Sequence, residues 1–174
     1  MYLSDLKNGS TIIVDSNIFV YHFSSRSKYN SACTDFLERI EEGDIVGITS
    51  TSIVMETTHR MMSLEAAILL PEVKTRDLIK YLKEHPDIVK KLINHQNIPH
   101  KIGLFNIEVI APDFGTIKRS QQMKTRFGFL SNDALTLQIM EDHKVSNLAS
   151  NDSDFEGVDF LTLYKPTPAV IKPQ

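Results

Sequence analysis

Residues 12–19 read IIVDSNIF, and this stretch decides the fold. Its first three residues form a continuous apolar run, which is typical of a strand buried on both faces of a parallel sheet. The run ends at Asp15, so an acidic side chain comes directly after the predicted strand. In parallel α/β sheets, ligands bind outside the carboxyl ends of the strands. The stretch therefore predicts a polar site that begins at Asp15.

Short apolar runs and helical patterns alternate along the rest of the chain. The apolar runs predict further strands at 45–48, 107–110, 145–149 and 160–164. Helical periodicity is clearest at 28–42 and 114–127, and Gly43 and Gly128 follow these segments where C-terminal caps belong. Another helix is expected to begin at Asp133, after Ser-Asn residues suited to capping. Strands that alternate with helices predict an α/β fold with a mostly parallel sheet and helices on both faces.

The chain has 174 residues, which is enough for one domain with a real core and short for two. We expect one domain over 1–174, with an extended helical insertion at about 64–103 that prolines interrupt. That insertion is interpreted as a helical pair covering the core, with a partner-binding clamp as the alternative. Its histidines, His85, His95 and His100, lack zinc-motif spacing and are expected to be solvated.

Composition limits the possible classes of protein. The single cysteine, Cys33, excludes an internal disulfide framework and a cysteine-based zinc cluster. No apolar stretch approaches the roughly 20 residues that span a bilayer, and nothing at the N-terminus resembles a signal peptide. These features predict a cytoplasmic protein with no membrane association. The net charge of −3 means that attraction for RNA would have to come from a local basic patch and from a bound metal ion.

Acidic residues recur at the predicted strand ends. Glu56 lies in the helix after the second strand, which a Ser/Thr cluster at 49–52 is suited to cap. Asp133 begins the helix before the fourth strand, and Asp152 and Asp154 follow that strand. Parallel topology brings such positions, with Asp15, to one edge of the sheet. We therefore expect these acids to meet in one pocket.

Crowded carboxylates need a compensating charge. Two ionised carboxylates ~4 Å apart repel by about 4 kcal/mol at an effective dielectric of 20. No Lys or Arg lies within the acidic motifs, which favours a bound cation over protonation. Oxygen ligands select a hard ion such as Mg²⁺ or Mn²⁺. Such an ion can activate water against a phosphodiester, so hydrolysis of phosphate esters is the predicted chemistry.

A simpler interpretation exists for each acid taken alone. An Asp after a strand usually caps a turn or a helix, and Asp133 and Asp154 are good N-cap candidates. Glu56 is harder to explain in this way, because it interrupts an apolar helical pattern. The order and setting of all the acids carry the prediction.

Four motifs resemble those of the PIN-domain nucleases, especially the VapC-type toxins of toxin–antitoxin pairs. They read IIVDSNIF (12–19), VME (54–56), LSNDAL (130–135) and LASNDSDF (148–155). The resemblance extends to the closing strand at 160–165 and so spans nearly the whole chain. It implies a three-layer α/β/α, PIN-like fold with a central parallel sheet of about five strands. It also implies a metal-dependent endoribonuclease that hydrolyses RNA, and frequently a homodimer with a cognate antitoxin.

The resemblance also assigns roles to residues. It implies that the four acids Asp15, Glu56, Asp133 and Asp152 form the catalytic, Mg²⁺- or Mn²⁺-binding site. It gives Asn17, Ser150 and Asp154 supporting roles. The insertion at 64–103 departs from the compact family pattern. The alternatives are an RNA-processing PIN nuclease unrelated to toxicity, and a non-catalytic PIN module that binds RNA or protein. An Asp-x-Asp phosphatase is disfavoured, because Asn17 stands where the second aspartate belongs.

Basic residues before the third motif are candidates for phosphate contacts. They are Lys118, Arg119, Lys124 and Arg126, all on one predicted helix. An ordinary solvated helix face explains them equally well. His22 and His59 lie near acids in the sequence, and a general-base role for either one is the less favoured alternative.

Overall fold

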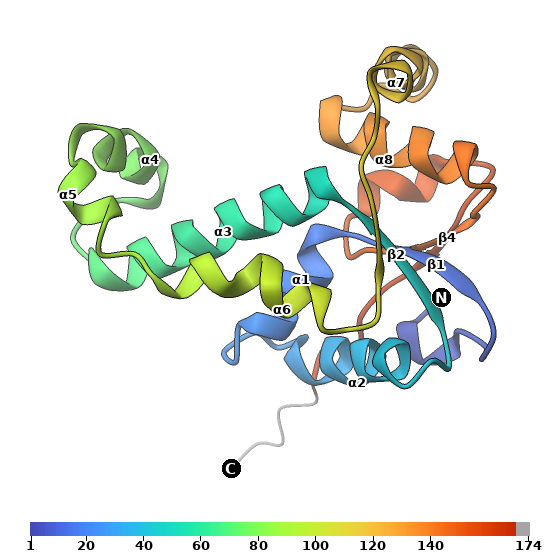
Figure 1. Cartoon of the computed structure of the whole chain (residues 1–174), viewed down its shortest axis with the longest axis horizontal. Coiled ribbons are helices and arrows are strands. Elements are labelled where there is room, and N and C mark those ends of the chain that lie inside the picture. The colour runs from blue at the N-terminus through green and yellow to red at the C-terminus, as the bar shows by residue number, and fades with distance from the viewer. Residues whose placement is uncertain (170–174) are drawn as a thin grey trace.

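The computed structural model describes residues 1–169, and a sheet of five parallel strands lies at its centre (Figure 1). The strand order is β3-β2-β1-β4-β5. The strands are β1 (Thr11–Val14), β2 (Val46–Ser50), β3 (Glu108–Ile110), β4 (Asn147–Ala149) and β5 (Thr162–Tyr164). The predicted five-stranded parallel sheet is therefore confirmed.

Helices cover both faces of this sheet, as the three-layer prediction requires. The α-helices are α1 (Ser16–Phe23), α2 (Asn30–Glu41), α3 (Thr51–Leu69), α4 (Thr75–Glu84), α5 (Pro86–Val89), α6 (Ile98–Gly103), α7 (Phe114–Phe127) and α8 (Ser131–Asp142). Short 3-10 helices are η1 (Leu3–Asp5), η2 (Asn94–Asn97) and η3 (Ser153–Gly157). Helix α2 lies on one side of the strands, and α7 and α8 lie on the other (Figure 1).

The central strand β1 is buried on both faces. Ile12, Ile13 and Val14 are at most 1% exposed, because β2 and β4 pair with this strand on either side. The chain forms β2 and β3 on one side of β1 before it crosses to β4 on the other side. The carboxyl ends of β1 and β4 therefore form the topological switch point at which α/β sheets bind ligands.

Two of the helix ends show the capping that their sequences predict. Ser50 caps α3 by accepting a hydrogen bond from the Ile53 amide, and Gly128 ends α7 in the left-handed conformation at φ 77°. Helix α8, however, begins at Ser131 with Leu130 as the N-cap, so the predicted start at Asp133 is wrong by two residues. Asp133 lies in the first turn, where the helix dipole favours a carboxylate.

The insertion at 64–103 is built on the far end of α3. Helices α4 and α5 pack there around a second cluster of buried residues, Ala66, Leu70, Leu78, Leu82 and Leu92. Figure 1 shows these two helices at the end of α3 that lies away from the sheet. Only α6 packs on the main core, through Ile98 and Ile102. The predicted helical pair covering the main core is therefore wrong for α4 and α5.

The Glu65 carboxylate holds the segment at 93–95, where the insertion comes back to α3. Glu65 on α3 accepts hydrogen bonds from the backbone amides of Ile93, Asn94 and His95, and from the Asn94 side chain. It also lies 3.0 Å from Nδ1 of His95, whose side chain is only 12% exposed. The prediction that His95 is solvated is wrong, because the imidazole pairs with this half-buried carboxylate.

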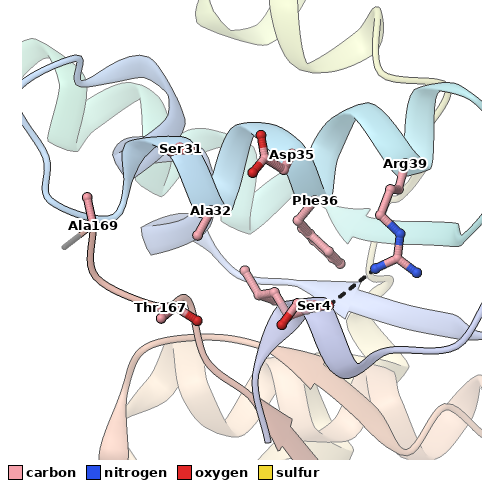
Figure 2. Close-up of a pocket in the computed structure, with 9 residues that line it drawn as sticks. Ser4, Ser31, Ala32, Asp35, Phe36, Arg39, Thr167 and Ala169 are labelled. Carbon is pink, nitrogen blue, oxygen red and sulfur yellow. Dashed lines mark hydrogen bonds between the residues drawn. The ribbon is translucent and has the colours of Figure 1, made fainter.

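A hollow of about 440 Å³ lies between α2 and the chain ends, and Figure 2 shows its lining. Arg39 points into it, and this guanidinium donates to the carbonyls of Leu3 and Leu6. None of the predicted site residues lines this hollow. Among residues 1–169, no helix has the length and apolar character that crossing a membrane requires.

Candidate active site

Asp15 is held rigidly at the carboxyl end of β1. Its carboxylate accepts hydrogen bonds from the Ser16 amide at 2.6 Å and from the Ser150 hydroxyl at 2.7 Å, and from the Asn17 side-chain amide. The same Asn17 amide donates to the Ser150 hydroxyl at 2.8 Å. Asn17 and Ser150 are buried, so their positions are fixed by packing. These two residues therefore hold the Asp15 carboxylate in one orientation.

The β4 end is tied to the same network. The amide of Asp152 donates to the Ser150 hydroxyl at 3.1 Å, and the amide of Asn151 donates to the side-chain oxygen of Asn17 at 3.0 Å. The Asp152 carboxylate accepts from the Asp154 amide and caps η3. Both aspartates are exposed, so their carboxylates face solvent beside the buried Asp15 network. The predicted N-cap role therefore falls on Asp152 rather than on Asp154.

Glu56 approaches from α3 and is held by three polar side chains. The Ser16 hydroxyl donates to one carboxylate oxygen at 2.8 Å, and the Asn132 amide donates to the other at 3.2 Å. Arg60, one helical turn after Glu56, lies 3.8 Å from it and donates to the Ser16 hydroxyl at 3.1 Å. Glu56 is thus linked to both the β1 and the α8 segments, although it is 31% exposed.

Asp133 has no such partners. Its carboxylate accepts no hydrogen bond among the described residues that would offset its partial burial. Desolvation, together with the negative charges of Asp15, Asp152, Glu56 and Asp154, raises the pKa of Asp133 from 3.8 to about 6. The structure therefore brings the four predicted acids and Asp154 within electrostatic range of one another.

Burial also raises the pKa of Asp15, and the charge of Glu56 adds to this effect. The hydrogen bonds from Ser150 and Ser16 act in the opposite direction but do not overcome desolvation. Two neighbouring carboxyl groups with raised pKa values indicate a site whose negative charge calls for a cation.

The expectation that all of the acids line one pocket is not met, because they are divided between two hollows and the residues beside them. Asp133 and Asp154 line one hollow, and Asp152 lines a second one together with Asn17 and Arg60. Within residues 1–169, no three carboxylate, imidazole or thiol groups already surround one ion-sized point. Mg²⁺ is usually held by one or two carboxylates and several waters, so an all-oxygen donor set of this kind fits such an ion.

Three polar residues of the site were not predicted: Ser16, Arg60 and Asn132. The expectation that the acids face no basic group is wrong, because Arg60 lies next to Glu56. The spacing of Glu56 and Arg60, i to i+4 on one helix, is visible in the sequence and indicates this contact. A single guanidinium, 41% exposed, does not balance five carboxylates.

The four basic residues on α7 do not form one free patch. Arg119 pairs with Asp142 at 2.6 Å and Arg126 pairs with Asp159 at 3.2 Å. Lys124 donates to the Ser131 hydroxyl, and at 3.6 residues per turn it points about 140° away from Arg119. Lys118 is exposed. A phosphate-binding role for these residues stays a prediction.

His22 lies in apolar surroundings outside the acidic cluster. Its Nδ1 is 2.9 Å from the Thr34 hydroxyl, and its ring packs edge-on against Phe23 and Phe105. Burial, with a smaller contribution from Lys101, lowers the pKa of this imidazole. These contacts give it a packing role and argue against its use as a general base in the acidic site.

A model of the PIN domain matches residues 12–161. This chain belongs to the PIN-domain family. The match includes all four motifs, so the family resemblance inferred from them is confirmed. As a PIN domain, the chain carries its acids where the family fold has a topological switch point, at the ends of β1 and β4.

Two named relatives come from Methanocaldococcus jannaschii. Ribonuclease VapC2 is 25% identical over 153 residues, which cover 87% of this chain and 91% of the relative. Ribonuclease VapC6 is 22% identical over 156 residues, which cover 90% and 97% of the two chains. Both relatives therefore resemble the chain over nearly their full lengths.

Solved structures share the fold. VapC20 of Mycobacterium tuberculosis is described as a toxin that cleaves the sarcin-ricin loop. It aligns with a TM-score of 0.52 at 13% identity, and the aligned region covers 86% of this chain and 96% of the VapC20 chain. VapBC2 of Rickettsia felis, bound to a promoter DNA fragment, has a TM-score of 0.54 at 14% identity, covering 90% and 99%. These similarities support the PIN-like α/β/α architecture.

Proposed function

We propose that this PIN domain is a metal-dependent endoribonuclease of the VapC type, which hydrolyses phosphodiester bonds in RNA. The observation that carries the proposal is the unpartnered Asp133 among four other carboxylates at the switch point of the sheet. The names of the two archaeal relatives, both ribonucleases, support RNA as the substrate.

Asp15, Asp133, Asp152 and Glu56 would hold Mg²⁺ or Mn²⁺, directly or through water. When bound, such an ion activates a water molecule and neutralises charge that develops on the phosphodiester. Asn17 and Ser150 keep the Asp15 carboxylate in one orientation through the bonds described above. Asp154 adds negative charge to the rim of the cluster.

Glu56 is the candidate for orienting a water or accepting its proton. Its two oxygens are held by Ser16 and Asn132 on opposite sides, so the carboxylate cannot rotate freely. Arg60 beside it supplies a positive charge that can contact a substrate phosphate. This arrangement gives α3 two chemically different groups at one edge of the site.

We also propose the cellular setting of this enzyme: a toxin that acts in the cytoplasm, forms homodimers and is inhibited by a cognate antitoxin protein. Toxin–antitoxin assemblies among the structures of the same fold, one of them from Klebsiella pneumoniae at 16% identity and a TM-score of 0.53, support this setting. The aligned region covers 87% of this chain and 95% of the Klebsiella chain. A small reading frame immediately upstream of the gene would support an antitoxin partner.

Cleavage of RNA tests the proposed activity. Purified protein with Mn²⁺ or Mg²⁺ should cut a long mixed-sequence RNA internally, and EDTA should stop the reaction. Asp15→Asn should abolish it, whereas the matched variant Asp35→Asn, at an exposed position on α2, should keep full activity. Full activity of Asp15→Asn would refute the assignment. Metal-independent RNA binding without cleavage would support a non-catalytic module instead.

A further inference from the structure

A groove on the other side of Arg60 is not used by the acidic site. It has a volume of about 590 Å³ and lies between α1, α3 and α4. Its walls are aliphatic and come from all three helices: Val20, Leu64, Ala67, Leu78 and Ile79. The groove exists because α4 returns against the far end of α3, so the insertion at 64–103 creates it.

The groove adjoins the acidic site. Tyr21 and Arg60 line both the groove and the smaller hollow that contains Asn17 and Asp152. Asn151 donates to the Tyr21 hydroxyl at 3.2 Å, which holds the phenol at this junction. A nucleic acid that extends from the groove towards the acids would therefore run past Tyr21 and Arg60.

We propose that this groove is the subsite for the nucleoside next to the phosphate that is cleaved. The proposal rests on the proposed ribonuclease function. The groove's volume falls in the range of small-ligand sites, about 300–1,000 Å³. Its aliphatic walls can pack against the faces of an unstacked base, as sites that recognise single-stranded RNA do.

Polar groups on the rim suit the rest of a nucleotide. The hydroxyls of Ser24 and Thr75 line the groove and can bond base edges or a ribose 2′-hydroxyl, whereas the Ser63 hydroxyl donates to the His59 carbonyl in its own helix. At the inner end, Arg60 can contact the adjoining phosphate while Tyr21 offers a ring for stacking. The groove thus offers apolar walls, hydroxyls and a guanidinium, which suit a base, a sugar and a phosphate.

The charge of the insertion suits a nucleic acid as the occupant. Residues 70–103 contain seven Lys or Arg and four Asp or Glu, which leaves twelve basic against eighteen acidic residues in the remainder of the chain. Lys74 and Lys80, both exposed, adjoin the groove-lining residues Thr75 and Ile79. An RNA chain that leaves the groove would therefore meet positive charge on α4, whereas the net negative charge of the remaining residues repels its phosphates.

Filling the groove tests the proposal. Ser63→Phe places a ring in it, Ser63→Ala keeps it open, and Ile68→Phe adds the same ring at a 73% exposed position elsewhere on α3. We expect Ser63→Phe to raise KM for RNA at least tenfold, with KM unchanged in the two controls. All three should hydrolyse bis(p-nitrophenyl) phosphate, a diester without nucleosides, at the wild-type rate. Thermal melting of each variant checks that it folds.

Photo-crosslinking provides a second measurement that needs no catalysis. RNA carrying 5-iodouridine, bound to the Asp15→Asn protein, should crosslink to peptides containing residues 60–67 or 75–79. Equal KM for Ser63→Phe and wild type, or crosslinks confined to α7, would overturn the groove assignment while leaving the ribonuclease intact. A wild-type protein that cuts neither RNA nor the small diester would instead refute the proposed function itself. If Ser63→Phe changes only binding to a protein partner, the groove belongs to that partner and not to RNA.

Discussion

Replacing Asp133 with Asn should make the metal-free protein more stable. The wild-type carboxylate is partly buried among four other carboxylates and accepts no compensating hydrogen bond in the described chain. Its amide counterpart has nearly the same shape and no charge. Above pH 6 the substitution therefore removes repulsion and desolvation cost without opening a cavity.

The magnitude follows from the pKa. A rise from 3.8 to about 6 corresponds to about 3 kcal/mol, at about 1.4 kcal/mol per pKa unit. Because the folded-state pKa lies above the unfolded value, the folded protein binds the proton more tightly. This contribution favours folding at pH 4 and is lost as the pH rises towards 6. The stability difference between Asp133→Asn and wild type should therefore grow over this window and reach a plateau above it.

The assay is urea unfolding in EDTA at several pH values between 4 and 8. At pH 8 we expect Asp133→Asn to exceed wild type by roughly 2–3 kcal/mol, or about 5–10 °C in Tm. Asp35→Asn, which changes net charge equally at an exposed site, should differ little at any pH. Adding Mn²⁺ should stabilise wild type and reverse the order. An Asp133→Asn protein that is no more stable than wild type in EDTA at pH 8 would refute the reasoning.

Three further substitutions test other parts of the structure. Ser150→Ala removes a hydrogen bond to Asp15, so the Mn²⁺ concentration for half-maximal RNA cleavage should rise roughly 10–100-fold; an unchanged concentration would contradict the orienting role. Glu65→Ala leaves three backbone amides without their acceptor, so the free energy of unfolding should fall by about 1–3 kcal/mol. The amide hydrogens of residues 93–95 should also exchange faster, and an unchanged exchange rate would contradict the role given to Glu65. Gly47→Ala places a Cβ 2.8 Å from two atoms of Ile40, and calorimetric melting should show a cost of about 1–3 kcal/mol, whereas an unchanged Tm would show that Ile40 can move aside.

The sheet and most helices could be predicted because local patterns and burial agree there. The fully apolar run at 12–14 became the central strand, and Gly43 and Gly128 both take positive φ at helix ends. The start of α8 was missed because Ser131 and Asn132 resemble capping residues. In the structure their side chains bond Lys124 and Glu56 instead.

The arrangement of the insertion could not be read from periodicity. A helix with apolar residues on one face must cover something, but its pattern does not say which cluster. Leu78 and Leu82 on α4 pack with Leu92 and the end of α3, a choice that depends on contacts distant in sequence. The prolines gave little guidance, because Pro86 and Pro99 lie in the first turns of helices rather than breaking them.

The acids of the site were predicted from their order along the chain, whereas their surroundings were not. Strand ends in a parallel sheet determine where Asp15 and Asp152 lie. The hydroxyl of Ser16 and the guanidinium of Arg60 contribute through side-chain orientation, which no linear pattern specifies. The exposed state of Asp152, beside the buried Asn17 and Ser150, likewise depends on how the β4 loop folds back.

Titration of Mn²⁺ into the protein at pH 7.5, followed by calorimetry, tests most directly whether these carboxylates form an ion site. We expect saturable binding to wild type and at least tenfold weaker binding to Asp15→Asn. Equal affinity of the two proteins for the ion, or no heat of binding to wild type at millimolar Mn²⁺, would contradict this prediction.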